Sequence, residues 1–94
     1  MFVITLRFAD KTKAPSLMDG HNARIKRGFD DGVFLLVGSL QPNAGGMILA
    51  HDTSHAELET RVQDDPFVAH GVVSAEILQV TPARTDDRLT FLKA

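Results

Sequence analysis

Hydrophobic residues alternate with other residues over the first stretch of the chain, between Phe2 and Ala9. An alternation with a period of two is typical of a β-strand, whose successive side chains point to opposite faces. Three later apolar segments, at 33–40, 46–51 and 72–80, have the length and the β-branched content of strands. The pattern therefore predicts four strands. In the second strand, simple alternation places Phe34 and Leu36 on one face and Val37 on the other.

A helix is predicted between the first two strands. Ser16 follows a polar loop and can cap a helix that runs from Leu17 to about Asp31, and Gly32 comes next as a C-terminal stop. The apolar residues of this segment recur with a helical period and form one stripe. His21 lies inside that stripe, so we expect it to face the protein interior.

A second helix is predicted between the third and fourth strands. Ser54 and Glu57 match the Ser-x-x-Glu capping box, in which each side chain bonds to the backbone N–H of the other residue. Leu58 and Val62 follow at a spacing of four, and the helix ends before Pro66. This start signal is specific.

The order strand–helix–strand–strand–helix–strand is that of the ferredoxin-like βαββαβ fold. We therefore expect an α+β protein with an antiparallel four-stranded sheet and two helices on one face. Residues 41–45 supply the Pro, Asn and Gly of a hairpin turn. Because both faces of the strands are apolar, the face without helices needs a cover. The sequence predicts a homodimer that is formed through this open face.

The chain directions in this fold place two distant segments at the same edge of the sheet. The start of the first helix meets the end of the second, so His21 is expected near Asp64 or Asp65. The spacing alone does not choose between the two carboxylates.

Composition limits the remaining possibilities. The 94 residues, 44% hydrophobic and 23% charged, suit a single globular domain, 1–94, and the absence of Cys excludes disulfides and thiolate-bound metals. A net charge of −2 without Trp or Tyr argues against nucleic-acid binding. No apolar run has the character of a membrane helix, and the first ten residues predict a strand rather than a signal peptide. We expect a cytoplasmic protein.

A series of short motifs resembles the YCII-related (YciI-like) proteins from the first strand to Pro82. The motifs are HNARI from His21, DGVFLLVGSL from Asp31, GMIL from Gly46, DPFVAHGV from Asp65, and a closing ILQVTP. The resemblance implies a dimeric α+β barrel with a core at 1–82 and a C-terminal tail at 83–94. It also implies that His21 and Asp65 form the active centre.

A paired His and Asp can move a proton without a cofactor. Histidine titrates near neutrality, and a carboxylate can fix its tautomer and stabilise the imidazolium. The hypothesis is a small cofactor-independent enzyme that uses this pair for proton abstraction, isomerisation or elimination on a compact oxygenated or aromatic metabolite. The alternative is a non-catalytic ligand-binding or accessory module with the same pocket, in which His21 is a buried structural residue.

Other residues are candidates for binding the ligand. The second strand ends at Gly38 and Ser39, where the related proteins have Gly-Pro, and the Ser39 hydroxyl could bind a substrate oxygen; a bulge before the turn is the alternative. Phe67 and His70 belong to the same motif as Asp65. His70 is expected either to line the same edge as Asp65 or to be a solvated loop residue, with the loop residue favoured.

Arg7 and two further histidines complete the candidates. Arg7 is expected either to pair with a carboxylate such as Glu76 or to bind an anionic ligand, with pairing favoured. His51 and His55 are four residues apart but lack a third ligand, so no metal site is predicted.

Overall fold

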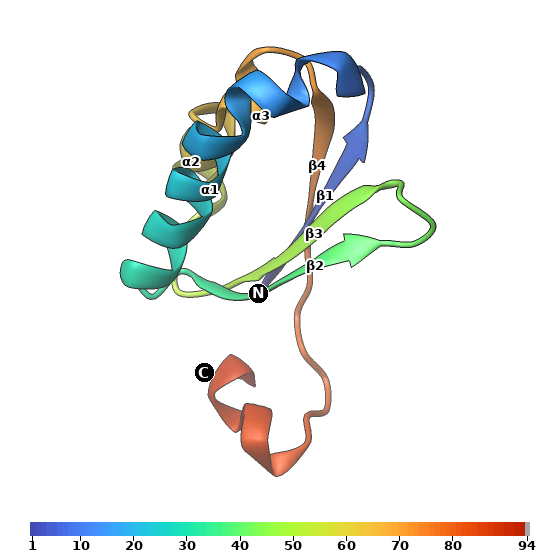
Figure 1. Ribbon diagram of the computed structural model, residues 1–94. Helices are drawn as coiled ribbons and strands as arrows, with labels where there is room; N and C mark the ends of the chain where they lie inside the picture. Colours follow the sequence, from blue (N-terminus) through green and yellow to red (C-terminus); the bar gives the residue numbers. More distant parts are fainter. Residues whose placement is uncertain (94) are drawn as a thin grey trace.

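Four antiparallel strands form one sheet, and the helices lie together on one of its faces (Figure 1). The computed structural model describes residues 1–93. The strands are β1 (Phe2–Phe8), β2 (Phe34–Leu40), β3 (Gly45–Ala50) and β4 (Val73–Gln79), and the helices are α1 (Ala14–Asp30), α2 (His55–Gln63) and the short α3 (Pro66–Ala69), with 3₁₀ turns η1 (Lys11–Lys13) and η2 (Asp87–Lys93). The spatial order is β2-β3-β1-β4. The predicted α+β, ferredoxin-like fold is thereby confirmed.

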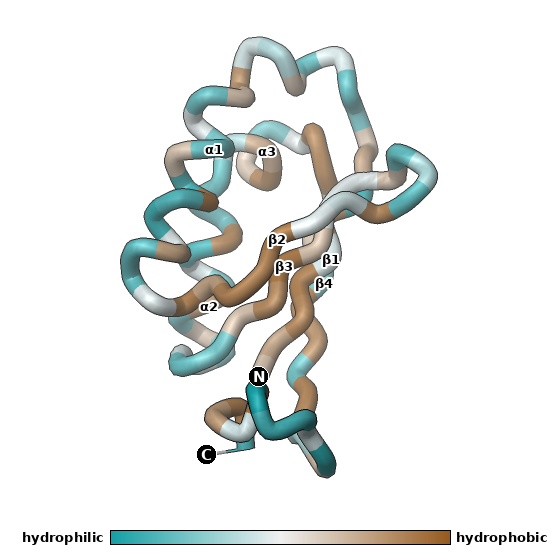
Figure 2. Tube along the Cα trace, turned by 60° about the horizontal axis from the view of Figure 1, so that its bottom comes forward, coloured by the Kyte–Doolittle hydropathy of each residue, from teal (hydrophilic) through white to brown (hydrophobic). Residues whose placement is uncertain are grey.

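The core lies between the sheet and the helices. Ile4 of the central strand β1 is opposite Ile48 on one side and Ile77 on the other. Ile4, Leu58 and Val72 are fully buried. Burial of a side chain of this size is worth roughly 1.5–3 kcal/mol. Figure 2 shows that the hydrophobic residues concentrate along the strands and that polar residues occupy most loops.

Strand β2 departs from simple alternation. Its register with β3 shifts between Phe34 and Leu36, which leaves Leu35 without a direct partner, as in a β-bulge. Phe34 is opposite Ala50 and Val37 is opposite Ile48, so both lie on the helix-covered face. The prediction that Phe34 and Val37 lie on opposite faces is therefore wrong, because the extra residue of the bulge reverses the alternation after Phe34.

Helix α1 begins earlier than predicted. It starts at Ala14, with Pro15 in its first turn, where a residue without a backbone N–H costs no hydrogen bond. The Ser16 hydroxyl donates to the Lys13 carbonyl oxygen at 3.0 Å and caps no backbone N–H. The preceding polar residues form η1, in which the Asp10 carboxylate accepts the Thr12 N–H. The predicted Ser16 cap is thus wrong.

Helix α2 begins as the capping box predicts. The Ser54 oxygen accepts the Glu57 N–H at 3.1 Å. Arg61 of this helix donates to the Asp31 carboxylate at 3.0 Å and so ties α2 to the end of α1. That hydrogen bond is the largest cause that lowers the pKa of the Asp31 carboxyl below its ordinary value. None of the helices in residues 1–93 has the length and apolar character needed to cross a membrane.

The C-terminal segment after β4 extends beyond the sheet and ends in η2 (Figure 1). Phe91 packs edge-on against His51, with ring centroids 5.5 Å apart. Leu92 is buried at 9% exposure, whereas Leu89 and Phe91 are largely exposed. The segment therefore touches the body of the domain through only part of its apolar side.

The sheet face without helices carries a continuous aliphatic row. Leu36, Leu49, Val3 and Leu78 are opposite one another in the register of the four strands. The two outer members, Leu36 and Leu78, are 47% and 45% exposed. This row is thus apolar, and within residues 1–93 its two ends are exposed.

Candidate active site

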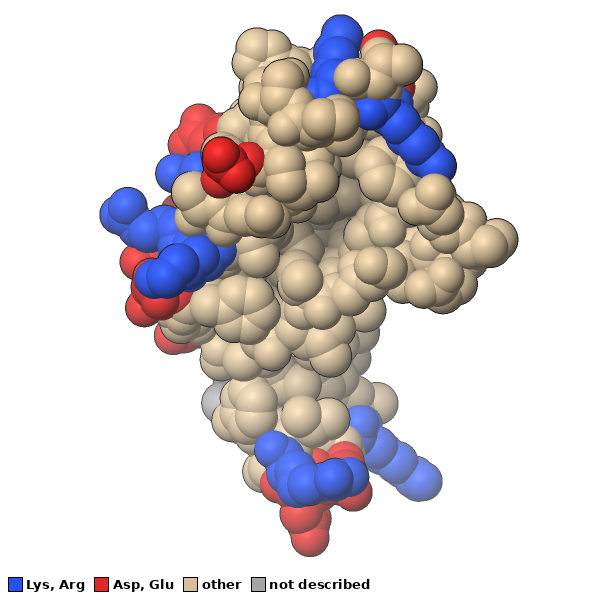
Figure 3. Space-filling view, in the orientation of Figure 1, with Lys and Arg blue, Asp and Glu red and all other residues tan. Residues whose placement is uncertain are grey.

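A cavity of about 400 Å³ opens between α1 and the helix-covered face of the sheet. Figure 3 shows the corresponding hollow, whose visible wall is formed by uncharged residues while the charged side chains lie towards the periphery. Among the described residues that line it, no Lys, Arg, Asp or Glu occurs, and His21 is the one titratable side chain. Most of the wall is apolar, with Leu6, Phe8 and Ile25 as examples.

His21 and Asp65 are hydrogen-bonded to each other at the helical side of this cavity. His21 lies in the first half of α1, and Asp65 is the N-cap residue of α3. The His21 Nδ1 atom lies 2.8 Å from Asp65 Oδ2 and 3.0 Å from Oδ1. The fold thus joins two residues that are 44 positions apart.

Local backbone geometry holds the Asp65 carboxylate in place. Its Oδ1 atom accepts the Phe67 N–H at 2.8 Å, which caps the first turn of α3. Asp65 is 6% exposed and is the only buried charged residue within residues 1–93. A buried carboxylate requires hydrogen-bond donors, and His21 with the Phe67 amide supplies them.

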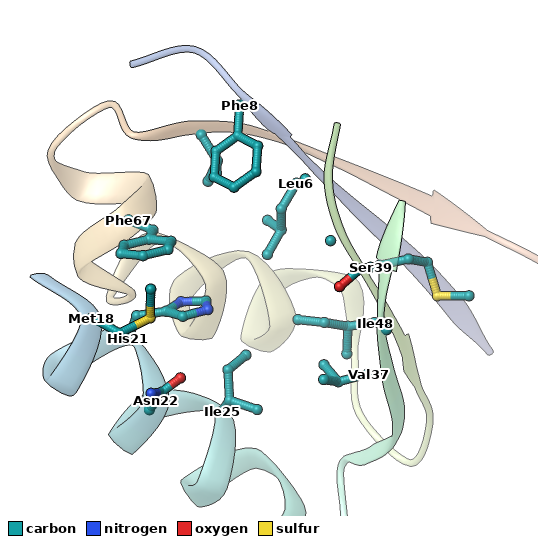
Figure 4. A pocket seen from close by; sticks show the side chains of 15 residues that line it. Leu6, Phe8, Met18, His21, Asn22, Ile25, Val37, Ser39, Ile48 and Phe67 are labelled. Atoms are coloured by element: carbon teal, nitrogen blue, oxygen red, sulfur yellow. The ribbon is translucent and has the colours of Figure 1, made fainter. Parts of the chain in front are cut away.

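The pairing assigns a role to each nitrogen of the His21 ring. An ionised carboxylate only accepts hydrogen bonds, so the hydrogen must lie on Nδ1. In the neutral form of the ring, the other nitrogen, Nε2, then has a free lone pair. The His21 ring lines the cavity beside Met18 and Phe67 (Figure 4).

Phe67 fixes the plane of the His21 ring. The two rings are stacked with centroids 4.0 Å apart and an interplanar angle of 3°. Phe67 is itself 5% exposed and also lines the cavity. The sequence indicated Phe67 only through its motif, whereas the structure shows a direct contact.

The structure distinguishes between the two adjacent carboxylates. The Asp64 side chain is 59% exposed, and its Oδ2 atom lies 3.6 Å from the Arg24 guanidinium. The Asp65 side chain is 8% exposed and faces His21. Asp65 is therefore the partner of His21.

The sheet contributes the opposite wall. Ser39 is opposite Gly46 in the β2–β3 register and lies on the helix-covered face, and its hydroxyl points into the cavity (Figure 4). Gly38 and Gly46 also line the cavity. Ser39 and His21 are thus on facing walls.

Two predicted binding residues lie outside this cavity. His70 is exposed at the end of α3, where its carbonyl oxygen accepts from Lys13 Nζ at 3.3 Å. Arg7 is exposed on the open sheet face, opposite Ser74, and forms no ion pair with Glu76 among the residues described. The predicted Arg7–Glu76 pairing is wrong because Glu76 is in register with Thr5 instead.

Further wall residues were not singled out from the sequence. Met18 and Asn22 line the cavity on either side of His21 along α1. Met18 belongs to the same apolar stripe as His21, so the helical period could have indicated it. Asn22 lies outside the stripe, and no sequence signal marks it.

His51 and His55 make separate contacts in the structure. His51 contacts Phe91, and His55 Nδ1 lies 3.7 Å from the Glu59 carboxylate. Within the described part of the chain, no three His, Cys, Asp or Glu residues are grouped so that they could hold a metal ion.

One solved structure with a similar fold is that of 5-chloro-2-hydroxyhydroquinone dehydrochlorinase (TftG) from Burkholderia phenoliruptrix AC1100, in complex with 2,5-dihydroxybenzoquinone. The TM-score is 0.61 at 14% sequence identity, over 86% of this chain and 94% of that chain. At this identity the likeness shows the fold and no more. No protein-family model and no curated protein sequence matches the chain.

Proposed function

We propose that the chain is a small cofactor-independent enzyme of the YCII-related type, in which His21 is the general acid/base and Asp65 orients it. The observation that carries the proposal is the hydrogen bond from His21 Nδ1 to a carboxylate that is 6% exposed, at the wall of a cavity of about 400 Å³. A histidine held in this way is suited to proton transfer near neutral pH.

The proposed reaction begins with removal of a proton from the substrate by His21 Nε2. The electron pair of the broken bond either moves onto a neighbouring carbonyl group as an enolate or expels a leaving group. The first course gives isomerisation, after the imidazolium returns the proton, and the second gives elimination. Asp65 stabilises the imidazolium in both. Because the imidazole itself carries the proton, no cofactor is needed.

The cavity favours a compact oxygenated or aromatic substrate. Phe8, Phe67 and Met18 offer flat or adaptable apolar surfaces. Ser39, on the wall opposite His21, offers a hydroxyl that can donate to or accept from a substrate oxygen. The solved neighbour is a dehydrochlorinase whose structure holds 2,5-dihydroxybenzoquinone, and this supports an oxygenated ring as the ligand class.

We further propose a homodimer formed through the open sheet face. The aliphatic row across all four strands supports it, because a row of this kind is costly to leave in water.

The single domain at 1–94, with its core at 1–82, and the cytoplasmic location also remain proposals. Absence of Cys is consistent with a reducing compartment.

The test uses 5-chloro-2-hydroxyhydroquinone as substrate and chloride release as readout, with 2,5-dihydroxybenzoquinone as binding probe. We expect His21→Asn and Asp65→Asn to lower kcat by about 10²–10⁴-fold, the usual range for loss of a general base. Asn at position 65 can still cap α3, so the variant keeps the fold. His55→Asn, which changes a histidine away from the cavity, is the matched control.

Three results would contradict parts of the proposal. Full activity of both variants would show that neither His21 nor Asp65 takes part in the reaction. Binding of the quinone without turnover of any related hydroquinone would indicate the alternative, a ligand-binding module. Absence of binding would show that the substrate class is wrong.

A further inference from the structure

A second and much smaller cavity, of about 10 Å³, adjoins the Asp65 side of the His21–Asp65 pair. His21 lines only the large cavity, and Asp65 lines only the small one. The hydrogen-bonded pair therefore borders both spaces, which also share Leu6, Ile25 and Ile48 as lining residues. A volume near 10 Å³ is about that needed by a single water molecule, provided that the site offers two or more polar partners.

Arg24 supplies the first polar partner. It lies one turn after His21 on α1 and lines the small cavity together with Asp65. Its terminal Nη2 atom lies 3.6 Å from Asp64 Oδ2. Its Nε atom is buried and has no hydrogen-bond partner among the residues described. A buried guanidinium N–H without an acceptor is rare, so this donor requires an explanation.

Asp65 supplies the second polar partner. Its Oδ1 atom already accepts from His21 and from the Phe67 N–H. Its Oδ2 atom accepts only from His21 within residues 1–93, although a carboxylate oxygen can accept two hydrogen bonds. Of the residues that line the small cavity, Arg24 thus has an unpaired donor and Asp65 has unused acceptor capacity.

The remaining polar residue of this cavity is otherwise engaged. Arg61 donates to Asp31 from Nη2 at 3.0 Å, and its guanidinium carbon lies 6.0 Å from the Phe34 ring centre. Apart from Arg24, Arg61 and Asp65, all residues that line the small cavity are apolar. Arg24 is therefore the residue best placed to act on Asp65.

We propose that one water molecule occupies the small cavity, accepts from Arg24 Nε–H and donates to Asp65 Oδ2, and that Arg24 is a positioning residue for the His21–Asp65 pair. Arg24 then holds the turn at 64–65 twice, by its direct contact with Asp64 and through the water on Asp65. This arrangement keeps Asp64 at the surface and Asp65 on His21. The catalytic consequence rests on the function proposed above.

The primary readout is the pair of ¹⁵N chemical shifts of the His21 ring, which report the tautomer without any substrate. In the wild type we expect the Nδ1–H tautomer. Arg24→Met removes both contacts, and Arg24→Lys keeps the positive charge but removes the Nε–H. Because both variants loosen the turn that holds Asp65 on His21, both should move the shifts towards a larger share of the Nε2–H tautomer. Arg27→Met, an exposed arginine on the same helix that pairs with Asp31, is the control and should leave them unchanged.

Two further measurements complete the test. A crystal structure of the wild-type protein should show one ordered water within hydrogen-bond distance of Arg24 Nε. With an active substrate, Arg24→Lys should lower kcat by about tenfold with KM within twofold, since the residue does not touch the ligand cavity. If Arg24→Met does not fold, the ¹⁵N shifts of Arg24→Lys are compared with those of the wild type in its place.

The outcomes separate this inference from the proposed function. Unchanged ¹⁵N shifts in a folded Arg24→Lys variant, or a cavity without a water at high resolution, would overturn the inference even if His21→Asn abolished turnover. Shifted tautomers in a protein without detectable turnover would support the positioning role and contradict only the proposed enzymatic function.

Discussion

At the level of single residues, Gly28 shows how closely α1 approaches the sheet. Gly28 is a buried residue of α1, and a Cβ atom built on it would lie 2.1 Å from Cδ2 of Phe34. No real contact of that length exists, so the Phe34 ring occupies the place of a side chain. The glycine is required by this packing rather than by its own backbone conformation.

We predict that Gly28→Ala destabilises the protein by about 1–3 kcal/mol, the range for overpacked cores. In an isolated helix the same change would stabilise by about 1 kcal/mol, so the sign of the effect reports the contact with Phe34. Chemical denaturation measures the free energy of unfolding. Phe34→Leu, combined with Gly28→Ala, should recover part of the lost free energy of unfolding. If Gly28→Ala alone stabilised the protein, α1 would not be in close contact with Phe34 of β2.

At the level of elements, the two serines near helix starts behave differently. Ser54 precedes α2, has an extended backbone and accepts the Glu57 N–H. Ser16 lies inside the first turn of α1, where its hydroxyl donates to a carbonyl oxygen. The residue type is the same, but only Ser54 satisfies a backbone N–H that the helix leaves without a partner.

We predict that Ser54→Ala lowers the free energy of unfolding by about 0.5–2 kcal/mol, the usual cost of a lost N-cap. Ser16→Ala, the matched control, should change it by less than about 0.5 kcal/mol, as surface substitutions usually do. Urea titration followed by circular dichroism compares the two variants. Equal losses would mean that Ser16 contributes a cap that its observed hydrogen bond does not show.

At the level of the whole molecule, the helices cover only one side of the sheet. The face without helices carries the row Leu36, Leu49, Val3 and Leu78, and the ends of this row are about half exposed in the described part of the chain. A small domain buries a limited share of its apolar surface, so a second copy would add to its core. Two sheets packed face to face would bury these residues at the centre of the interface.

Light scattering should therefore give a mass of twice the chain's 10.3 kDa at micromolar concentration. Leu36→Lys and Leu78→Lys should each produce folded monomers, because an unpaired charge at a dry interface is costly to bury. Ala23→Lys, at an exposed position of α1, should remain dimeric. A monomeric wild type would contradict the proposed assembly.

Local signals in the sequence were sufficient for most of the fold. The alternation in β1, the capping box at Ser54 and the turn residues at 41–45 each depend on near neighbours, and each leads to the element that is observed. The βαββαβ order then restricts the chain directions, which is why His21 could be expected near the 64–65 turn. Residue types and their order are enough for inferences of this kind.

Other features depend on contacts between distant segments, which residue order does not reveal. The bulge at Leu35 shifts the faces of β2, and the start of α1 moves to Ala14 because η1 and Pro15 form the entry to the helix. Tertiary packing buries Asp65 rather than Asp64, as the motif resemblance implied, and places Arg24, whose Nε has no partner among the described residues, beside a cavity that Asp65 also lines. The sequence by itself determined the elements and their order, because these follow from local periodicity and caps. Only the tertiary structure decided how deeply Asp65 is buried against His21 and what surrounds the pair, because burial is a property of the assembled layers.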